Sequence, residues 1–398
     1  MMFSREGHLY PLDFHLESLT SRMESFFVVA ISKLPFWGIS FSAALILASF
    51  TPKLYALMHR RSDTSAVQSA HARPTLRLGG IACFLAILLE SLTADISASI
   101  ARNLVIAGTP LFLVGLLEDF GIHMSPSKRM GAICISVLVA IYIFQISINH
   151  VGVPGLDFLL GFSVIALLFT VFAVSGVVNA FNLIDGINGL ASYTAATVAI
   201  SLSVISFGMG HQDLQHVSII IMLSALGFFA VNYPFGRLFL GDAGAYFLGF
   251  ILVCVALILC HRQPDISAFA ILLIFFWPVA DTCLAIWRRL RLSTPHDRPD
   301  RLHFHQLVMR FIEIRMLGRS SRGLSNPVAT FVLMPLIAAP QIIGVIFITD
   351  HSYAVFAVLI FSVLFFGSYV FGMELAKRGH RRMSDSNQER PKNSVAAE

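Results

Sequence analysis

Two adjacent carboxylates end a stretch that is otherwise apolar, and their position suggests chemistry. Glu118 and Asp119 follow this stretch directly, and a short loop with Lys128 comes next. Neighbouring carboxylates repel each other unless a cation or a shared proton lies between them. The pair therefore predicts a hard divalent ion such as Mg²⁺, or a proton acceptor, with Lys128 available for an anion. A pair of solvated loop charges is the alternative.

A second polar group interrupts the apolar sequence about sixty residues later. Asn179, Asn182 and Asp185 have the spacing i, i+3, i+6, which places them along one face of a helix, and Asn188 follows. Their oxygen and amide groups could bind a base edge, a ribose or a hydrated ion. A structural break between two apolar segments is the alternative.

A lone carboxylate, Asp242, opens a long apolar segment between two glycines. A carboxylate at such a place should be neutral, paired or bound to a metal ion. Capping of the helix that begins there is the competing interpretation.

Basic residues and histidines provide groups that could bind anions. Arg73 and Arg77 precede a Gly-Gly pair that permits close backbone approach, and they could grip a phosphate or simply anchor the chain's topology. Later, Arg301 precedes His303 and His305. Two histidines at i and i+2 do not share a helix face, so they fit an irregular loop facing a pyrophosphate better than a zinc helix motif.

The elements that position these residues follow from composition. Of the 398 residues, 56% are hydrophobic and only 13% are charged, with a mean hydropathy of +0.76. Soluble domains carry about a quarter charged residues. Repeated apolar runs near the ~20 residues needed to cross a bilayer, without strand-like alternation, predict an all-α, polytopic transmembrane bundle. About eleven spans are expected, at 36–56, 79–96, 101–117, 131–149, 157–176, 188–207, 215–232, 239–261, 268–288, 327–349 and 353–374.

Orientation follows from the Lys and Arg residues, of which there are 28. Most lie in the loops after the odd-numbered spans and in the C-terminal tail. The positive-inside rule then predicts a periplasmic N-terminus, a cytoplasmic C-terminus and polar clusters that face the cytoplasm. We expect an N-terminal periplasmic segment (1–35), a transmembrane catalytic domain (36–375) and a basic, disordered cytoplasmic tail (376–398).

Known phosphate-binding devices are absent from the sequence, which has neither a GxxxxGK[ST] loop nor a GxGxxG fingerprint. Five cysteines show no CxxC spacing. The available groups are carboxylates for a cation and Arg, His and Lys for anions, which suits displacement at phosphorus. A transporter that uses the same carboxylates as an ion or proton path is the rival class, although these carboxylates gather at one predicted face.

Taken in order, these clusters resemble the polyprenyl-phosphate N-acetylhexosamine-1-phosphate transferases, over roughly residues 71 to 307. The resemblance implies a multi-pass protein of the bacterial inner membrane. Such an enzyme moves a sugar-1-phosphate from a UDP-sugar to undecaprenyl phosphate in the inner leaflet, releases UMP, and starts a surface polysaccharide such as O-antigen or capsule. It also implies Mg²⁺, with Mn²⁺ as a substitute, allows a homodimer, and gives no reason to expect nucleic acid as a partner.

The resemblance also assigns roles to residues. Glu118 and Asp119 match the acidic pair, with Asp119 deprotonating or orienting the lipid phosphate, and Asp242, with Asp119, matches the Mg²⁺ ligands. The nucleotide motif falls on Asn179, Asn182, Asp185 and Asn188, and the histidine loop that faces the diphosphate falls on His303 and His305. Glu118, Asn188 and Gln306 depart from the usual Asp, Asp and His.

Overall fold

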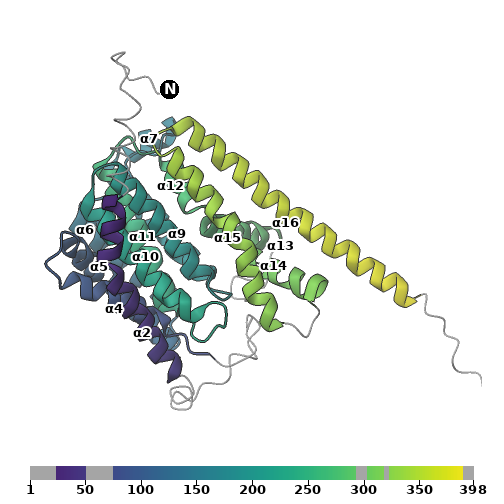
Figure 1. The fold of residues 1–398 in the computed structure, drawn as a ribbon. Coiled ribbons are helices and arrows are strands. Elements are labelled where there is room, and N and C mark those ends of the chain that lie inside the picture. The colour runs from purple at the N-terminus through teal and green to yellow at the C-terminus, as the bar shows by residue number, and fades with distance from the viewer. Residues whose placement is uncertain (1–23, 51–74, 293–302, 318–321, 389–398) are drawn as a thin grey trace, which may run out of the picture.

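The computed structural model describes residues 24–50, 75–292, 303–317 and 322–388, and its regular elements in these ranges are helices. Figure 1 shows them as a bundle of long helices from which the last one projects. The helices are α2 (Leu34–Ser49), α4 (Gly79–Ser91), α5 (Ala98–Asp119), α6 (Pro126–Phe144), α7 (Pro154–Leu160), α8 (Ser163–Leu183), α9 (Leu190–Gly208), α10 (Gln212–Asn232), α11 (Gly241–Arg262), α12 (Ala268–Ile274), α13 (Phe276–Leu292), α14 (Phe304–Ile312), α15 (Arg322–Ile346) and α16 (His351–Gln388). The predicted all-α class is confirmed for the described part of the chain.

The predicted eleven spans correspond to helices, but the count is not confirmed. Among the described residues, nine helices are long and apolar enough to cross a membrane. The predicted span at 79–96 is the 13-residue helix α4, which at 1.5 Å per residue covers only about 20 Å of a ~30 Å hydrocarbon core. The predicted span at 268–288 is broken into α12 and α13, which meet at 85°. Average hydropathy reveals neither feature, because it records how apolar a segment is and not where a helix begins, ends or bends.

Both predicted end segments differ from the structure. The apolar helical stretch that includes α2 begins at Glu24, inside the segment expected to precede the first span. At the other end, α16 continues to Gln388, well past residue 376, where a disordered tail was expected. The local sequence is mixed, because Lys, Arg, Met and Gln favour helix and no proline occurs between residue 376 and Pro391, whereas Gly379 and the run from Ser384 to Asn387 do not favour helix.

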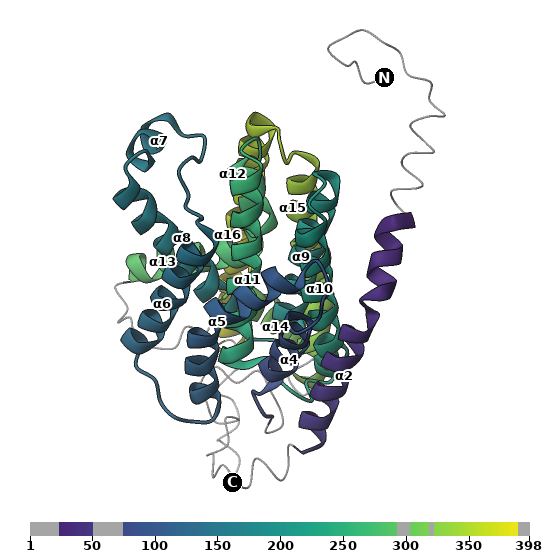
Figure 2. The same ribbon diagram turned by 90° about the vertical axis from the view of Figure 1, so that its left-hand side faces the viewer.

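Helix α11 forms the core of the bundle. Nearly every residue from Gly241 to Leu259 is buried, because α4, α5, α8, α9 and α10 pack around it. Figure 2 shows α11 behind α5, with α8 and α10 on either side. A helix that is apolar on all sides is suited to such a position. The residues at the two ends of α11 are therefore held in place by at least five neighbouring helices.

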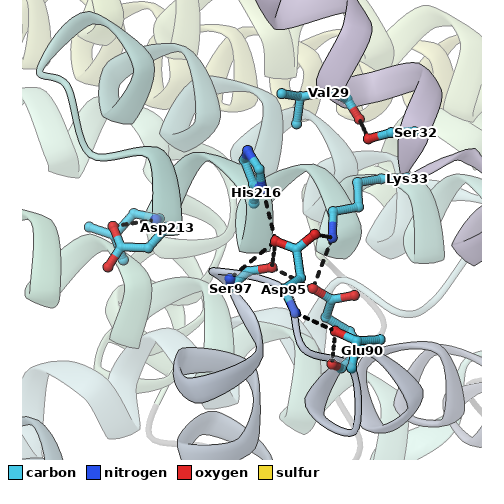
Figure 3. Close-up of polar contacts among 10 residues, drawn as sticks. Val29, Ser32, Lys33, Glu90, Asp95, Ser97, Asp213 and His216 are labelled. Carbon is cyan, nitrogen blue, oxygen red and sulfur yellow. Dashed lines mark hydrogen bonds and ion pairs between the residues drawn. The ribbon is translucent and has the colours of Figure 1, made fainter.

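An ionic network lies at the end of the bundle where α4 ends and α5 and α10 begin, opposite the N-terminus of α11 (Figure 3). The Lys33 ammonium lies 3.0 Å from Glu90 Oε1 and 2.7 Å from Asp95 Oδ2. Ser97 donates to Glu90, and His216 Nδ1 lies 3.2 Å from Asp95 Oδ1. Burial alone would raise the pKa of Asp95, but its hydrogen bonds from Lys33 and His216 outweigh this and lower it to about 2. The network ties α2 to the helices around α11, and the sequence had not singled it out.

Replacing Lys33 with Met should destabilise the fold. Glu90 is fully buried, and removing the cation would leave its carboxylate uncompensated, at a cost of about 3–5 kcal/mol. We expect a clear drop in the midpoint of thermal unfolding in detergent. Arg262→Met is the matched control, because its pair with Asp213 is partly exposed and exposed pairs contribute about 1 kcal/mol or less. Equal midpoints for the two variants would contradict this reading of the network.

Candidate active site

The site begins with the tight turn that starts α11. Gly241 adopts φ +77°, a conformation that favours glycine. The first residues of α4 run alongside this turn, where Gly79 N donates to Phe239 O and Gly80 N donates to Leu240 O, each at 2.8 Å. A Cβ on Gly80 would lie 2.3 Å from Gly244 N. The Gly-Gly pair therefore permits a close backbone approach, as predicted. The backbone that approaches it is the start of α11.

Carboxylates from two other helix ends satisfy the first three backbone N–H groups of α11. Asp185, after α8, accepts from Gly241 N at 3.1 Å. Asp119, the last residue of α5, accepts from Asp242 N at 3.0 Å and from Ala243 N at 2.9 Å. These N–H groups have no partner within the helix, and the positive end of the helix dipole favours anions. Asp119 is almost fully buried, so its first role is to hold the start of α11.

Asp242 is the third carboxylate at this turn. Its own side chain makes no capping bond to α11; instead it lies 3.5 Å from Arg77 and 3.8 Å from Arg129, and it accepts from Asn182 Nδ2 at 3.1 Å. The capping interpretation is therefore wrong. Asp119, Asp185 and Asp242 gather with two arginines at one end of one buried helix, as the sequence predicted for the three aspartates.

Glu118 contacts the loop that follows α5, and Lys128 is exposed. Glu118 accepts from Met124 N at 2.7 Å and lies 3.7 Å from His123, so it turns toward the loop between α5 and α6. Adjacent helix residues do not face the same way: these two contacts of Glu118 lie at the loop, whereas both oxygens of Asp119 meet the start of α11. The Lys128 side chain is exposed, and the Arg129 guanidinium is the group on α6 that approaches Asp242.

The four residues of the predicted nucleotide motif separate into two groups. Asn182 and Asp185 reach the start of α11, as described above. Asn179 donates back to Ser175 O in its own helix. Asn188 is buried, and it bonds to Asn326 through its backbone and to Pro234 O through its amide. The amide nitrogen thereby secures the loop before α11, whereas the buried Oδ1 has no hydrogen-bond partner among the described residues, and the role of Asn188 in substrate binding stays a prediction.

The two predicted histidines form a second cluster beside the first. His303 Nδ1 and His305 Nδ1 lie 3.3 Å and 3.2 Å from the same oxygen of Asp281, in α13. A Cβ on Gly186 would lie 2.5 Å from His305 Nε2. The His305 ring therefore packs against the turn that carries Asp185. This contact brings one of the two predicted histidines next to Asp185.

Two predicted residues, Arg73 and Arg301, lie outside the described residues. Arg129, by contrast, is a site residue that the prediction missed. The sequence holds no clear signal for it, because what sets Arg129 apart is the burial, seen only in the structure, of the positions three, four and seven residues later in α6, namely Ala132, Ile133 and Ser136. The corresponding positions after Lys128 include the exposed Gly131 and Ile135.

The turn with Asp185 lies outside the membrane-spanning helices. Burial raises the pKa of Asp185 from 3.8 to about 6, and the Arg77 charge and the Gly241 N–H oppose this rise. Because the folded pKa is raised, the stabilising contribution of this group is full below about 3.8 and is lost as the pH rises through about 6. The ionised form, which best accepts from Gly241, accumulates in the same interval.

We therefore expect the reaction at this site to slow as the pH falls through about 6. Replacing Arg77 with Gln removes a charge that holds the pKa of Asp185 down, so the acid limb of the pH–rate profile should move to higher pH. Rates normalised to each variant's own maximum separate this shift from a general loss of activity. An acid limb that stays in place in the Arg77→Gln protein would contradict the assignment of this limb to Asp185.

The donor set can be compared with the preferences of Mg²⁺. Among the described residues no three His, Cys, Asp or Glu side chains form a ready metal cage. Mg²⁺, however, usually takes only one or two carboxylates and completes its shell with water and substrate phosphates. Asp242, whose carboxylate makes no backbone contact at the helix start, fits that pattern. Both oxygens of Asp119 are already engaged by backbone N–H groups, which makes it the weaker candidate.

Comparison with known proteins gives results of two kinds. Residues 101–260 match the model of glycosyl transferase family 4. A "Probable undecaprenyl-phosphate N-acetylglucosaminyl 1-phosphate transferase" of Bacillus subtilis (strain 168) is 27% identical over 251 residues, which cover 63% of this chain and 70% of that protein. An undecaprenyl-phosphate alpha-N-acetylglucosaminyl 1-phosphate transferase of Salmonella typhimurium is 28% identical over 332 residues, covering 79% and 86%. A decaprenyl-phosphate N-acetylglucosaminephosphotransferase of Mycobacterium leprae is 25% identical over 303 residues, covering 67% and 75%. The matched family segment contains Asp119, Asp185 and Asp242.

Proposed function

We propose that this chain, which matches the model of glycosyl transferase family 4 over residues 101–260, transfers N-acetylhexosamine-1-phosphate from a UDP-sugar to undecaprenyl phosphate. UMP is released, and the product is a lipid-linked diphosphate sugar that begins a cell-surface polysaccharide. One observation carries the proposal beyond family membership. Three aspartates from separate helix ends meet two arginines at the N-terminus of a buried helix, where anionic groups are stabilised.

In the proposed reaction, an oxygen of the lipid phosphate attacks the β-phosphorus of the UDP-sugar. The new bond joins that oxygen to phosphorus, and the bond from the β-phosphorus to the bridging oxygen breaks, so UMP leaves with the electron pair. A phosphate monoester has a second pKa of about 6 and is largely dianionic at pH 7. The attacking group therefore needs little help from a base, which agrees with an Asp119 engaged by backbone N–H groups.

The protein's contribution to this reaction is placement and charge. Arg77 and Arg129 would bind the diphosphate, and Asp242 would hold Mg²⁺. When bound, the ion would neutralise the charge that develops on the phosphate oxygens. Asp119 and Asp185 keep the first turn of α11 in place. Asn182, which donates to Asp242, orients that carboxylate.

The proposed setting is the bacterial inner membrane, with the start of α11 on the cytoplasmic side. Nine long apolar helices among the described residues support a multi-pass protein, and the Lys/Arg-rich loops support the orientation. On this side the site would meet UDP-sugars in solution and the lipid phosphate in the inner leaflet.

The test is a panel of UDP-N-acetylhexosamines with purified protein, Mg²⁺ and undecaprenyl phosphate. We expect UMP and a lipid-linked diphosphate sugar to form together from at least one donor, and neither to form if Mg²⁺ or the lipid is left out. Substrate movement across proteoliposomes without UMP release would refute the proposal and favour the rival transporter function.

A further inference from the structure

Asp281 is a buried carboxylate to which neither the sequence nor the family comparison assigns a role. It lies in α13 and its side chain has no exposed surface. Its Oδ1 accepts from the Phe304 backbone N–H at 2.9 Å, while Oδ2 faces both histidines. One carboxylate therefore fixes the start of α14 and the two rings that precede and follow Phe304. Ionisable side chains buried among apolar helices usually belong to a functional site.

The geometry determines which ring nitrogen carries the proton. An ionised carboxylate accepts hydrogen bonds and donates none, so both Nδ1 atoms must be donors to Oδ2. A neutral histidine has one N–H, and each Nε2 is then left as an acceptor. The rings stack 5.6 Å apart with an interplanar angle of 18°. Asp281 thus gives both histidines the same tautomer and a similar orientation.

The rings do not occupy equivalent places. His305 has no exposed surface, and its Nε2 has no hydrogen-bond partner among the described residues. This atom lies against Gly186, in the turn next to Asp185. His303 keeps 6% of its side chain exposed. The pair therefore connects Asp281 on one side with the aspartate turn on the other.

Aromatic packing keeps the start of α14 in place independently of the histidines. The Phe304 ring stacks on Phe365 at 4.7 Å and meets Trp277 edge-on at 5.3 Å. An isosteric change at Asp281 should therefore leave the helix where it is and alter only what the rings donate or accept.

We propose that Asp281 is a positioning residue, which holds His303 and His305 as Nδ1–H tautomers, so that the Nε2 of the partly exposed His303 can bind a proton and donate a hydrogen bond to the reacting diphosphate, while the buried Nε2 of His305 stays against the Asp185 turn. This inference rests on the proposed transferase function for its kinetic consequences, but not for the tautomers themselves. The carboxylate takes no direct part in bond making or breaking.

The test is Asp281→Asn. The amide oxygen can still accept from Phe304 N, whereas the amide nitrogen is a donor and cannot accept from a ring Nδ1–H. We expect both rings to move toward the Nε2–H tautomer. In the UMP-release assay kcat should fall by about 100-fold or more, since replacing a carboxylate behind a catalytic histidine by its amide can cost about 10,000-fold. The KM for the UDP-sugar should change by less than about threefold, as for an interaction used mainly in the transition state.

Two controls make the outcome decisive. Asp157→Asn is the matched variant, because Asp157 also contacts a histidine Nδ1, at 3.0 Å, and accepts from backbone N–H groups, but in α7 near the opposite end of the bundle. Its kcat should stay within about twofold of wild type. Tautomers are read independently of activity, by ¹⁵N NMR of histidine-labelled protein with His303→Gln and His305→Gln used for assignment.

The positioning role of Asp281 would be established by two results together. The wild type would show Nδ1–H tautomers that Asp281→Asn lacks, and kcat would fall in Asp281→Asn. An Asp281→Asn protein with unchanged kcat would overturn it, and so would a wild type with Nε2–H rings. A wild type that releases no UMP from any donor would count against the proposed function, and the NMR result would still decide the tautomers.

Discussion

An Asp119→Asn protein should lose about 100- to 1,000-fold in kcat, the range found when a preorganised polar group is removed from an active site. Asp119 accepts from two consecutive N–H groups at the start of α11 with its two oxygens. Asparagine offers one oxygen, and its amide nitrogen would face the other N–H as a second donor. A buried donor left without a partner costs about 1–3 kcal/mol, so the first turn of α11 should shift.

The Asp157→Asn protein is again the matched control, since Asp157 also accepts from two backbone N–H groups, those of Val151 and Gly152. It should keep wild-type activity. Circular dichroism and size-exclusion elution should show that both variants remain folded. Full activity in Asp119→Asn would mean that the start of α11 is not the catalytic site.

Asp242→Asn should reduce kcat by at least about 100-fold and raise the Mg²⁺ concentration needed for half-maximal rate. The side chain lies between two guanidinium groups, and loss of its charge would remove the carboxylate that both of them approach and that is best placed for the ion. Titrating Mg²⁺ in the UMP-release assay, with wild type alongside, measures both effects.

Asp213→Asn provides the comparison for this second change. Asp213 also pairs with an arginine of α11, Arg262, but at the other end of that helix. We expect its rate and its Mg²⁺ requirement to match those of wild type. If Asp242→Asn responded to Mg²⁺ as wild type does, Asp242 would not be a ligand of the ion.

The sequence was informative where a residue type is costly in its setting. Asp119, Asp185 and Asp242 interrupt apolar segments, so each demanded a partner or a ligand, and helix ends were the natural place for all three. The sequence was less informative about the direction in which each side chain points. Glu118 is as acidic as Asp119, but the two residues leave α5 on different sides, and a linear sequence does not show which side faces α11.

Other differences between prediction and structure also concern the direction of a side chain or a helix. Lys128 and Arg129 are adjacent cations, and only the burial pattern of α6 separates the exposed one from the one near Asp242. Asn188 belongs to a recognisable motif, but its partners come from Pro234 and Asn326, distant in sequence. The 85° break between α12 and α13 lies just before Pro278, which has no N–H to donate to Ile274 O and whose ring clashes with that carbonyl; hydropathy alone predicted a straight span there.

The location of the donor diphosphate tests the central claim most directly. A cryo-EM structure with UDP-N-acetylglucosamine and Mn²⁺ should show the diphosphate and the cation at the first turn of α11, with the cation on Asp242 and the phosphates beside Arg77 and Arg129. A nucleotide bound elsewhere, with Asp242 still between the two arginines, would contradict the account.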